Sequence, residues 1–407
     1  ARSTMRKLQA QGVTAERSCE KLGHATQPRP SAGPLVWLHA ASVGESLSVL
    51  ALITRMGQIL PTAHFLITSG TATSAKLVAQ RLPPRTVHQF APLDAPRPVK
   101  RFLNHWQPDA AIFVESELWP QMLRRTHATG ARMALVNARM SEKTVAFWAE
   151  WPQAARYIFD VFALILTQND AMAQNMIRMN APAERVARGV NLKSMSGPLP
   201  VDASALQEVR TTLADRPIWV ASSTHEGEES AVLSAHRQLL KRFPGLCLIL
   251  APRHPERGDI VEQLIASDGL SYRRRSRGEA PGGQVYLADT MGELGLWYEM
   301  AEIVFLGGSL LPIGGHNPFE VAQAGAAVLT GNHVAAFAET YALLETEGAA
   351  RIIADGDDLA ARVAVLLTDP DELAAMTSAA QRFTATQDDQ LDAIATRLIT
   401  ALELDRA

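Results

Sequence analysis

Short apolar segments alternate with amphipathic stretches along almost the whole chain of 407 residues. The apolar segments predict strands, and the amphipathic stretches predict helices, for example at 46–60, 73–82 and 119–129. The strand candidates are 35–41, 64–69, 110–115, 132–138, 162–167, 218–223, 246–251, 284–288, 302–306 and 326–330. Because these segments lack polar alternation and are joined through helices, they predict parallel sheets covered on both faces. The expected fold class is therefore α/β, with two doubly wound parallel-sheet domains.

The same pattern predicts how the chain is divided. The segment 192–206 contains one Gly and two Pro and has no apolar periodicity, which is typical of a linker. We expect Rossmann-like domains at 31–191 and 207–385, a basic segment at 1–30 and a C-terminal helix at 386–407. The last helical patterns are 357–368, 371–386 and 388–404. Two such domains usually face each other across a cleft, with ligands at the carboxyl ends of the strands.

Composition excludes several classes of protein. A chain of this length with 47% hydrophobic residues has room for two or three domains of ~100–200 residues. The formal net charge of −3 argues against a bulk nucleic-acid binder. Cys19 and Cys247 lie far apart in the sequence, so neither a disulfide framework nor a CxxC metal site is expected, which fits a reducing compartment. No apolar run reaches the ~18 residues of a membrane span, and no signal peptide is visible.

The first thirty residues differ in charge from the rest. They contain Arg2, Arg6, Lys7, Arg17, Lys21 and Arg29 against Glu16 and Glu20. A basic segment of this kind can lie on an anionic membrane surface. On composition alone, a solvated and partly ordered tail is the better interpretation.

Two acidic motifs follow strands in the first half. In H-A-A-S-V-G-E at 39–45, the small residues let the backbone approach a ligand closely at the start of the next helix. Glu45, near that helix start, is either a partner of the helix dipole or a base that accepts a proton. Position alone favours the dipole partner. In E-S-E-L-W-P at 115–120, Glu115 and Glu117 share a face if the segment is extended. A functional pair and a simpler arrangement, with Glu117 as a cap and Glu115 in solvent, are equally supported.

Three motifs follow strands in the second half. The hydroxyls and glycine of S-S-T-H-E-G-E-E at 222–229 suit an anion at a helix start. Its acids resemble first-turn residues more than metal ligands. Arg253, held between prolines in A-P-R-H-P-E-R, suits a phosphate or base contact, with ordinary surface arginine as the alternative. The two glycine pairs at 307–320 let backbone N–H groups approach a phosphate, and Glu320 can accept hydrogen bonds from a ribose.

Some nucleotide and hydrolase motifs are absent from the sequence. There is no GxGxxG after the first strand, which disfavours a nicotinamide cofactor. The P-loop pattern GxxxxGK[ST] and the nucleophile elbow GxSxG are missing as well.

Taken together, the motifs closely resemble those of the Kdo (3-deoxy-D-manno-octulosonic acid) transferases of Gram-negative bacteria. The resemblance runs from the stretch at 16–23 to the C-terminal helices. It rests on the motifs described above and on V-N-A-R-M-S (136–141), N-L-K (191–193), D-T-M-G-E-L (289–294) and G-G-H-N-P-F-E (314–320). So many specific motifs in the same order make coincidence improbable.

The resemblance implies a GT-B fold and an inverting transfer of Kdo from CMP-Kdo to a lipid A precursor, without a metal ion or other cofactor. Glu45 would be the catalytic base and Glu115 the second essential acid, with Ser42, Gly44 and Glu117 on the acceptor side. The implied donor-binding residues are Lys193, Ser223, Thr224, Arg253, Met291, Gly292, Asn317 and Glu320. An inverting displacement needs one base and stabilisation of the leaving phosphate, and these residues can supply both.

The resemblance also implies a place at the cytoplasmic side of the inner membrane, with no nucleic-acid partner. Family members usually have an apolar anchoring segment ahead of the first domain, and this sequence lacks one, so residues 1–30 would be its juxtamembrane part. Val190 replaces the usual glycine before N-L-K, and Ser194 and Met195 are atypical. The alternatives are another GT-B transferase or epimerase that uses a UDP-sugar, and a non-catalytic membrane-associated scaffold.

Overall fold

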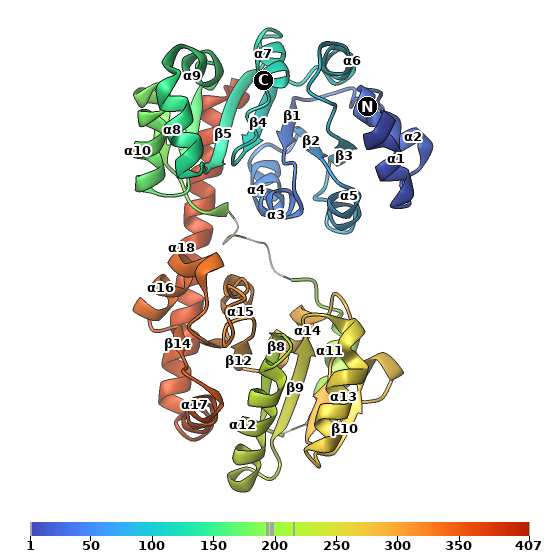
Figure 1. Ribbon diagram of the computed structural model, residues 1–407, viewed down its shortest axis with the longest axis vertical. Coiled ribbons are helices and arrows are strands. Elements are labelled where there is room, and N and C mark those ends of the chain that lie inside the picture. The colour runs from blue at the N-terminus through green and yellow to red at the C-terminus, as the bar shows by residue number, and fades with distance from the viewer. Residues whose placement is uncertain (1, 193–194, 196–198, 215, 407) are drawn as a thin grey trace. The chain divides into compact units, whose positions relative to one another are not determined.

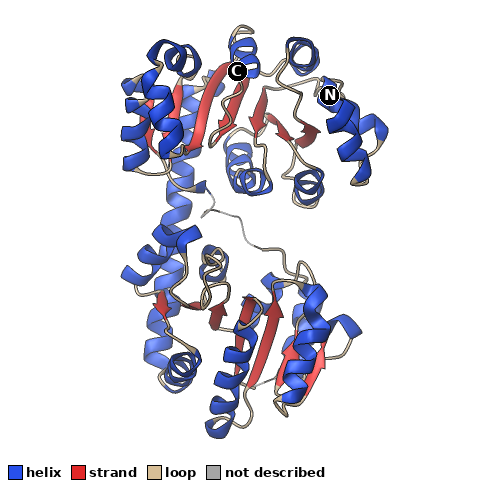
Figure 2. Cartoon of the chain, in the orientation of Figure 1, coloured by secondary structure: helices blue, strands red, loops and turns tan. Residues whose placement is uncertain are grey.

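The computed structural model describes residues 2–192, 195, 199–214 and 216–406 (Figures 1 and 2). Contacts divide the chain into two compact units. The N-terminal unit comprises 1–196 and 388–407, and the C-terminal unit comprises 197–387. Each unit contains a seven-stranded sheet in which every pair of neighbouring strands is parallel. The predicted fold class of two Rossmann-like α/β units is therefore confirmed.

The sheet of the N-terminal unit has the order β3-β2-β1-β4-β5-β6-β7. Its strands are β1 (Leu35–His39), β2 (His64–Ser69), β3 (Thr86–Phe90), β4 (Ala110–Val114), β5 (Arg132–Ala138), β6 (Leu164–Thr167) and β7 (Val186–Arg188). The helices are α1 (Arg2–Ala10), α2 (Ala15–Ser18), α3 (Val43–Ser48), α4 (Leu50–Ile59), α5 (Ala72–Ala79), α6 (Pro96–Trp106), α7 (Pro120–His127), α8 (Glu142–Glu150), α9 (Pro152–Phe159) and α10 (Asp170–Arg178).

Both faces of this sheet are buried, which explains why its central strands are apolar throughout. Val36 and Leu38 of β1 point to the face covered by α4 and the end of the last helix. Their neighbours Leu35 and Trp37 point to the opposite face, covered by α6 to α10. Successive strand side chains alternate between faces, so a strand covered on both sides needs an apolar residue at every position.

The sheet of the C-terminal unit has the order β10-β11-β9-β8-β12-β13-β14. Its strands are β8 (Ile218–Thr224), β9 (Cys247–Pro252), β10 (Tyr272–Arg274), β11 (Val285–Leu287), β12 (Ile303–Leu306), β13 (Ala327–Thr330) and β14 (Ala350–Ile352). The helices are α11 (Ala203–Leu213), α12 (Glu228–Arg242), α13 (Gly258–Ser267), α14 (Leu294–Met300), α15 (Phe319–Gln323), α16 (Ala338–Thr346), α17 (Gly356–Thr368) and α18 (Pro370–Ala401). Buried clusters again cover both faces.

The end of the chain differs from the prediction. Separate helices at 371–386 and 388–404 were expected, but α18 runs unbroken from Pro370 to Ala401. Ala379, Ala380 and Phe383 of this helix join the core of the C-terminal unit. Leu391 and Leu398 join the core of the N-terminal unit. The first part of the helix packs on one core and the last part on the other, so the apolar pattern changes along the helix. That change was interpreted as the end of one helix and the start of another.

The predicted linker is also too long. Its last residues already belong to α11, whose N-cap is Asp202 and whose first helical residue is Ala203. The Asp202 carboxylate accepts from the backbone N–H groups of Ser204 and Ala205 at 2.9 and 3.1 Å. An Asp that caps in this way marks a helix start, and the absence of apolar periodicity concealed it.

The basic N-terminal segment packs on the N-terminal unit through its second half. Glu20 is fully buried and accepts a 2.7 Å hydrogen bond from the backbone N–H of Phe90. Arg17 pairs with Glu20 at 3.3 Å and lies over the Phe90 ring. Residues 17–20 are therefore part of the fold and not a solvated tail.

Candidate active site

The order of strands in the N-terminal unit reverses direction between β1 and β4. In open α/β sheets, ligands bind beside the carboxyl ends of the strands at this switch point. The motif at 39–45 follows β1, and the motif at 115–120 follows β4. The topology thus brings together the two acidic motifs that the sequence placed 70 residues apart.

Glu45 lies in the first turn of α3, and its carboxylate turns back to the start of that helix. Its Oε2 accepts from the Ala41 N–H at 2.9 Å, and its Oε1 accepts from the Ser42 hydroxyl at 2.7 Å. Ser42 is the N-cap, and its Oγ accepts from the Glu45 N–H at 3.3 Å. This reciprocal arrangement is a variant of the capping box, in which the Glu side chain accepts from the N–H of the residue before the N-cap. The helix-start interpretation of Glu45 is therefore right about its local structure, and Gly44 lies within the same turn.

The surroundings of Glu45 also suit a base. Burial raises the pKa of Glu45 above its usual 4.5, and the negative charges of Glu117 and Glu115 add to the increase, while the bonds from Ser42 and Ala41 oppose it. A carboxylate with a raised pKa accepts a proton more readily than an ordinary one. Capping and proton transfer are compatible, since each carboxylate oxygen has a second lone pair.

Glu115 is buried, so of the two alternatives the one that placed it in solvent is wrong. Its backbone has a φ of +55°, a left-handed conformation that is uncommon outside glycine. The segment is therefore not extended, and the argument that Glu115 and Glu117 share a strand face does not hold. Asn137, at the end of β5 with a φ of +53°, donates from Nδ2 to Glu115 Oε1 at 3.2 Å. Strain of this kind clusters at functional sites.

Glu117 is paired with His39, which sequence reasoning did not single out. His39 Nε2 lies 3.2 Å from Glu117 Oε2, and the Trp119 indole N–H donates to the same carboxylate oxygen. On the other side of the ring, His39 Nδ1 lies 3.0 Å from the Thr68 hydroxyl. Burial acts to raise the pKa of Glu117, but the interactions with His39 and Trp119 outweigh it and hold that pKa below 4.5. Glu117 therefore stays ionised beside Glu45.

In the C-terminal unit the strand order reverses between β8 and β12, where the motifs at 222–229 and 307–320 end up. Glu228 joins the two. Its Oε2 accepts from the N–H groups of His225 and Gly308 at 3.0 and 2.7 Å, and its Oε1 accepts from Ser309 and Leu310, both at 2.9 Å. One buried carboxylate thus fixes both loops.

Glu229 has a different partner. It is fully buried and forms an ion pair with Arg257, whose Nη1 lies 2.6 Å from Glu229 Oε1. Glu228 and Glu229 occupy the first turn of α12, as predicted. Because Glu228 is held by backbone N–H groups and Glu229 by a guanidinium, the two acids have structural partners that a metal ion would have to displace.

Two histidines meet at the same switch point. Nε2 of His225, after β8, lies 2.9 Å from Nε2 of His316, after β12. Their ring planes differ by 7°, and the ring centroids are 5.1 Å apart, so the rings meet edge to edge almost in one plane. The sequence showed two strand-end histidines but gave no sign that they pair.

The other predicted donor-side residues follow the strands of the same sheet. Ser223 has a φ of +54°, and the Thr224 hydroxyl is buried without a partner among the described residues. Asn317 Oδ1 accepts from the Phe319 N–H at 3.1 Å, and Glu320 lies in the first turn of α15. The remaining donor-side residues are Arg253, exposed after β9; Met291, 72% exposed; and Gly292, with a φ of +84°. Lys193 lies outside the described residues.

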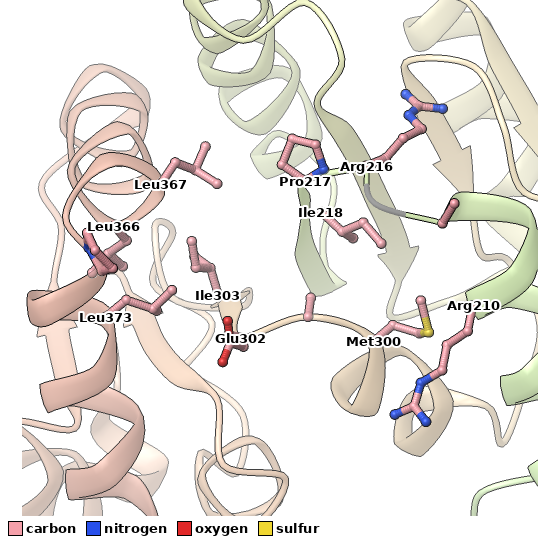
Figure 3. A pocket seen from close by; sticks show the side chains of 13 residues that line it. Arg210, Arg216, Pro217, Ile218, Met300, Glu302, Ile303, Leu366, Leu367 and Leu373 are labelled. Atoms are coloured by element: carbon pink, nitrogen blue, oxygen red, sulfur yellow. The ribbon is translucent and has the colours of Figure 1, made fainter.

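A hollow of about 680 Å³ opens elsewhere in the C-terminal unit (Figure 3). It is lined by Ile218 and Ile303, which begin β8 and β12, and by Leu366, Leu367 and Leu373. Ile218 and Ile303 are at the amino ends of their strands, opposite the ends that precede His225 and His316. The hollow is therefore separate from the candidate site.

Comparison with known proteins gives one consistent family. Residues 16–196 match the family model described as 3-deoxy-D-manno-octulosonic-acid transferase (kdotransferase). A 3-deoxy-D-manno-octulosonic acid transferase of Haemophilus influenzae is 33% identical over 85% of this chain and 81% of its own length. A probable mitochondrial 3-deoxy-D-manno-octulosonic acid transferase of Arabidopsis thaliana is 34% identical over 78% of this chain and 73% of its own.

Solved structures support the fold. A glycosyltransferase from Rickettsia africae has a TM-score of 0.56 at 12% identity and covers 91% of this chain and 98% of its own. A UDP-GlcNAc 2-epimerase from Neisseria meningitidis has a TM-score of 0.56 at 13% identity and covers 87% of this chain and 100% of its own. These similarities indicate the GT-B fold and do not distinguish between substrates.

Proposed function

Because this chain belongs to the family of 3-deoxy-D-manno-octulosonic acid transferases, and is thus a glycosyltransferase, we propose that it transfers Kdo from CMP-Kdo to a lipid A precursor such as lipid IVA. The observation that carries the proposal is the carboxylate of Glu45, which has a raised pKa and lies in the acidic strand-end site of the N-terminal unit. The acceptor would bind to this unit and the donor to the C-terminal unit.

Glu45 is the proposed base. In an inverting displacement, the acceptor hydroxyl attacks the anomeric carbon, its proton passes to Glu45, and the bond from that carbon to the phosphate oxygen breaks on the opposite side. The raised pKa makes Glu45 a better proton acceptor. Glu115, fixed by Asn137, and the ionised Glu117 keep negative charge beside it, which favours proton uptake.

The C-terminal unit supplies the proposed donor site. Arg253 and the backbone around Ser223 and Thr224 would hold the CMP phosphate, and Asn317 and Glu320 would bind the nucleoside. Backbone N–H groups and a guanidinium can stabilise the leaving phosphate without a metal ion, and the proposed reaction uses neither a metal nor a cofactor. Met291, exposed beside Gly292, would pack against the base of the nucleotide.

A lipid acceptor places the proposed reaction at the cytoplasmic face of the inner membrane. The basic residues ahead of α2 would lie near anionic headgroups. No helix in the described part of the chain is both long and apolar enough to cross a membrane.

Two measurements test the proposal. Calorimetry with CMP and UDP distinguishes it from a UDP-sugar transferase or epimerase, and a preference for UDP would contradict the CMP-Kdo assignment. Mass spectrometry of the product made from CMP-Kdo and a defined lipid A precursor shows whether Kdo is transferred and how many residues are added. A scaffold without activity would give no product from CMP-Kdo.

The Glu45→Gln variant separates capping from catalysis. Gln at this helix position still completes a capping box, but it cannot accept the proton. We expect the thermal transition to stay close to wild type and the transfer rate to fall by about 10²–10⁴-fold. Glu142→Gln, which alters an exposed acid in the first turn of α8, is the matched control. Wild-type activity in Glu45→Gln would remove Glu45 from the mechanism.

A further inference from the structure

The edge-to-edge contact of His225 and His316 restricts where their protons lie. With Nε2 atoms 2.9 Å apart in nearly coplanar rings, one Nε2 carries a hydrogen and the other accepts it. In the neutral pair, the donor ring therefore has a lone pair on Nδ1, whereas the acceptor ring carries its hydrogen there. Neither Nδ1 has a hydrogen-bond partner among the described residues. The pair thus has one free position for an additional proton.

The pair lies where the proposed donor phosphate would bind. His225 follows β8 and His316 follows β12, on either side of the switch point, and Gly308 lies beneath them. A Cβ at Gly308 would come within 2.9 Å of the His316 ring and 3.5 Å of the His225 ring. Close approach of backbone and imidazole leaves room only for glycine, whose φ here is +68°. This contact fixes the ring plane against the glycine-rich loop.

Burial, together with the neighbouring positive charges, keeps the pair neutral when no anion is bound. Burial lowers the pKa of His316 to about 4, and the neighbouring His225, Arg253 and His254 contribute to the decrease. Burial also lowers the pKa of His225, with contributions from His254, Arg253 and Arg257. Glu228 opposes the decrease in both, but its carboxylate is already shared among four N–H groups.

We propose that the His225–His316 pair binds the phosphate of the donor and takes up one proton from solvent as that phosphate gains negative charge. The proton binds to the free Nδ1, which leaves a hydrogen on both Nδ1 atoms and a net charge of +1 on the pair. This inference rests on the proposed function, because it assumes a CMP-sugar donor.

The reaction itself increases the charge that the pair meets. The phosphate of a CMP-sugar is a diester with one negative charge, and the departing CMP is a monoester that approaches two. A cation that forms only as this charge develops stabilises the leaving group more than the ground state, which is the condition for faster chemistry. Arg253 is always positively charged, whereas the histidine pair becomes positively charged only when it takes up the proton.

Isothermal titration calorimetry of CMP binding tests the proposal. The wild-type chain is titrated at pH 7.5 in HEPES and in Tris, whose ionisation enthalpies differ, and the slope of binding enthalpy against ionisation enthalpy gives the protons taken up. We expect about one proton per CMP, and about none for cytidine, which has no phosphate. CMP binding without proton uptake would overturn the inference but leave the proposed function intact. Failure to bind CMP at all would instead count against the proposed function.

Variants identify the residues responsible. His316→Gln and His225→Gln should each abolish the proton uptake and weaken CMP binding by about tenfold. His254→Gln, which alters the exposed neighbour, should keep the uptake. If the uptake persists in both His316→Gln and His225→Gln, the proton binds elsewhere and the inference is wrong. Should either variant fail to fold, the wild-type titrations with CMP and cytidine still decide whether a proton is bound.

Discussion

Glu228 offers the most direct test of how the donor-side loops are held. Its carboxylate accepts four backbone N–H bonds of 2.7–3.0 Å from the loops after β8 and β12. In Glu228→Ala all four donors lose this acceptor. Gly308 and Ser309 are buried residues, whereas His225 and Leu310 are half-buried, so we expect water to replace the carboxylate only at the latter two.

The magnitude follows from the two buried donors. Leaving a buried polar group unsatisfied costs about 1–3 kcal/mol, so Glu228→Ala should lower the free energy of unfolding of the C-terminal unit by about 2–6 kcal/mol. Glu228→Gln should also be destabilising, because its NH₂ group would face N–H donors. Glu226→Ala, two residues away and exposed, is the control and should stay within about 0.5 kcal/mol of wild type.

Hydrogen exchange gives the assay. Because the chain has two units, a single unfolding transition does not isolate one of them, whereas mass spectrometry of peptides covering 304–312 does. We expect the amides of 308–310 to lose protection in Glu228→Ala, and urea denaturation to show the reduced stability. Protected amides together with unchanged urea stability would show that the carboxylate does not hold the two loops.

Three further predictions concern other contacts. Glu117→Gln removes a negative charge that raises the pKa of Glu45, so the acid limb of the pH–rate profile should move to lower pH; an unmoved limb would show that Glu117 does not act on the base. Arg257→Met leaves the fully buried Glu229 without its counter-charge, so the free energy of unfolding measured by urea denaturation should fall by about 3–5 kcal/mol. A decrease below about 1 kcal/mol would contradict a buried ion pair. Gly23→Ala places a Cβ 2.0 Å from the Pro98 carbonyl oxygen at a φ of +81°, so the melting temperature should fall clearly.

The sequence by itself determined the two α/β units and the positions of the polar motifs that follow their strands. The ten strands it predicted are those whose apolar character is continuous, because both faces are covered by helices. It did not predict β3, β7, β10 or β14, which are the edge strands of the two sheets. These edge strands contain polar or charged residues, such as His88 and Gln89 in β3 and Arg188 in β7, and β7 has no buried residue. Their apolar signal is therefore weak.

Only the tertiary structure decided which side chains meet. Capping of α3 by Ser42 and Glu45 is local and could be read from their spacing. The pairing of His39 with Glu117 joins β1 to β4, and that of His225 with His316 joins β8 to β12, at sequence separations of 78 and 91 residues. Such contacts depend on strand order, which periodicity does not encode. The sequence located the candidate motifs at strand ends, and the topology determined which of these ends lie together.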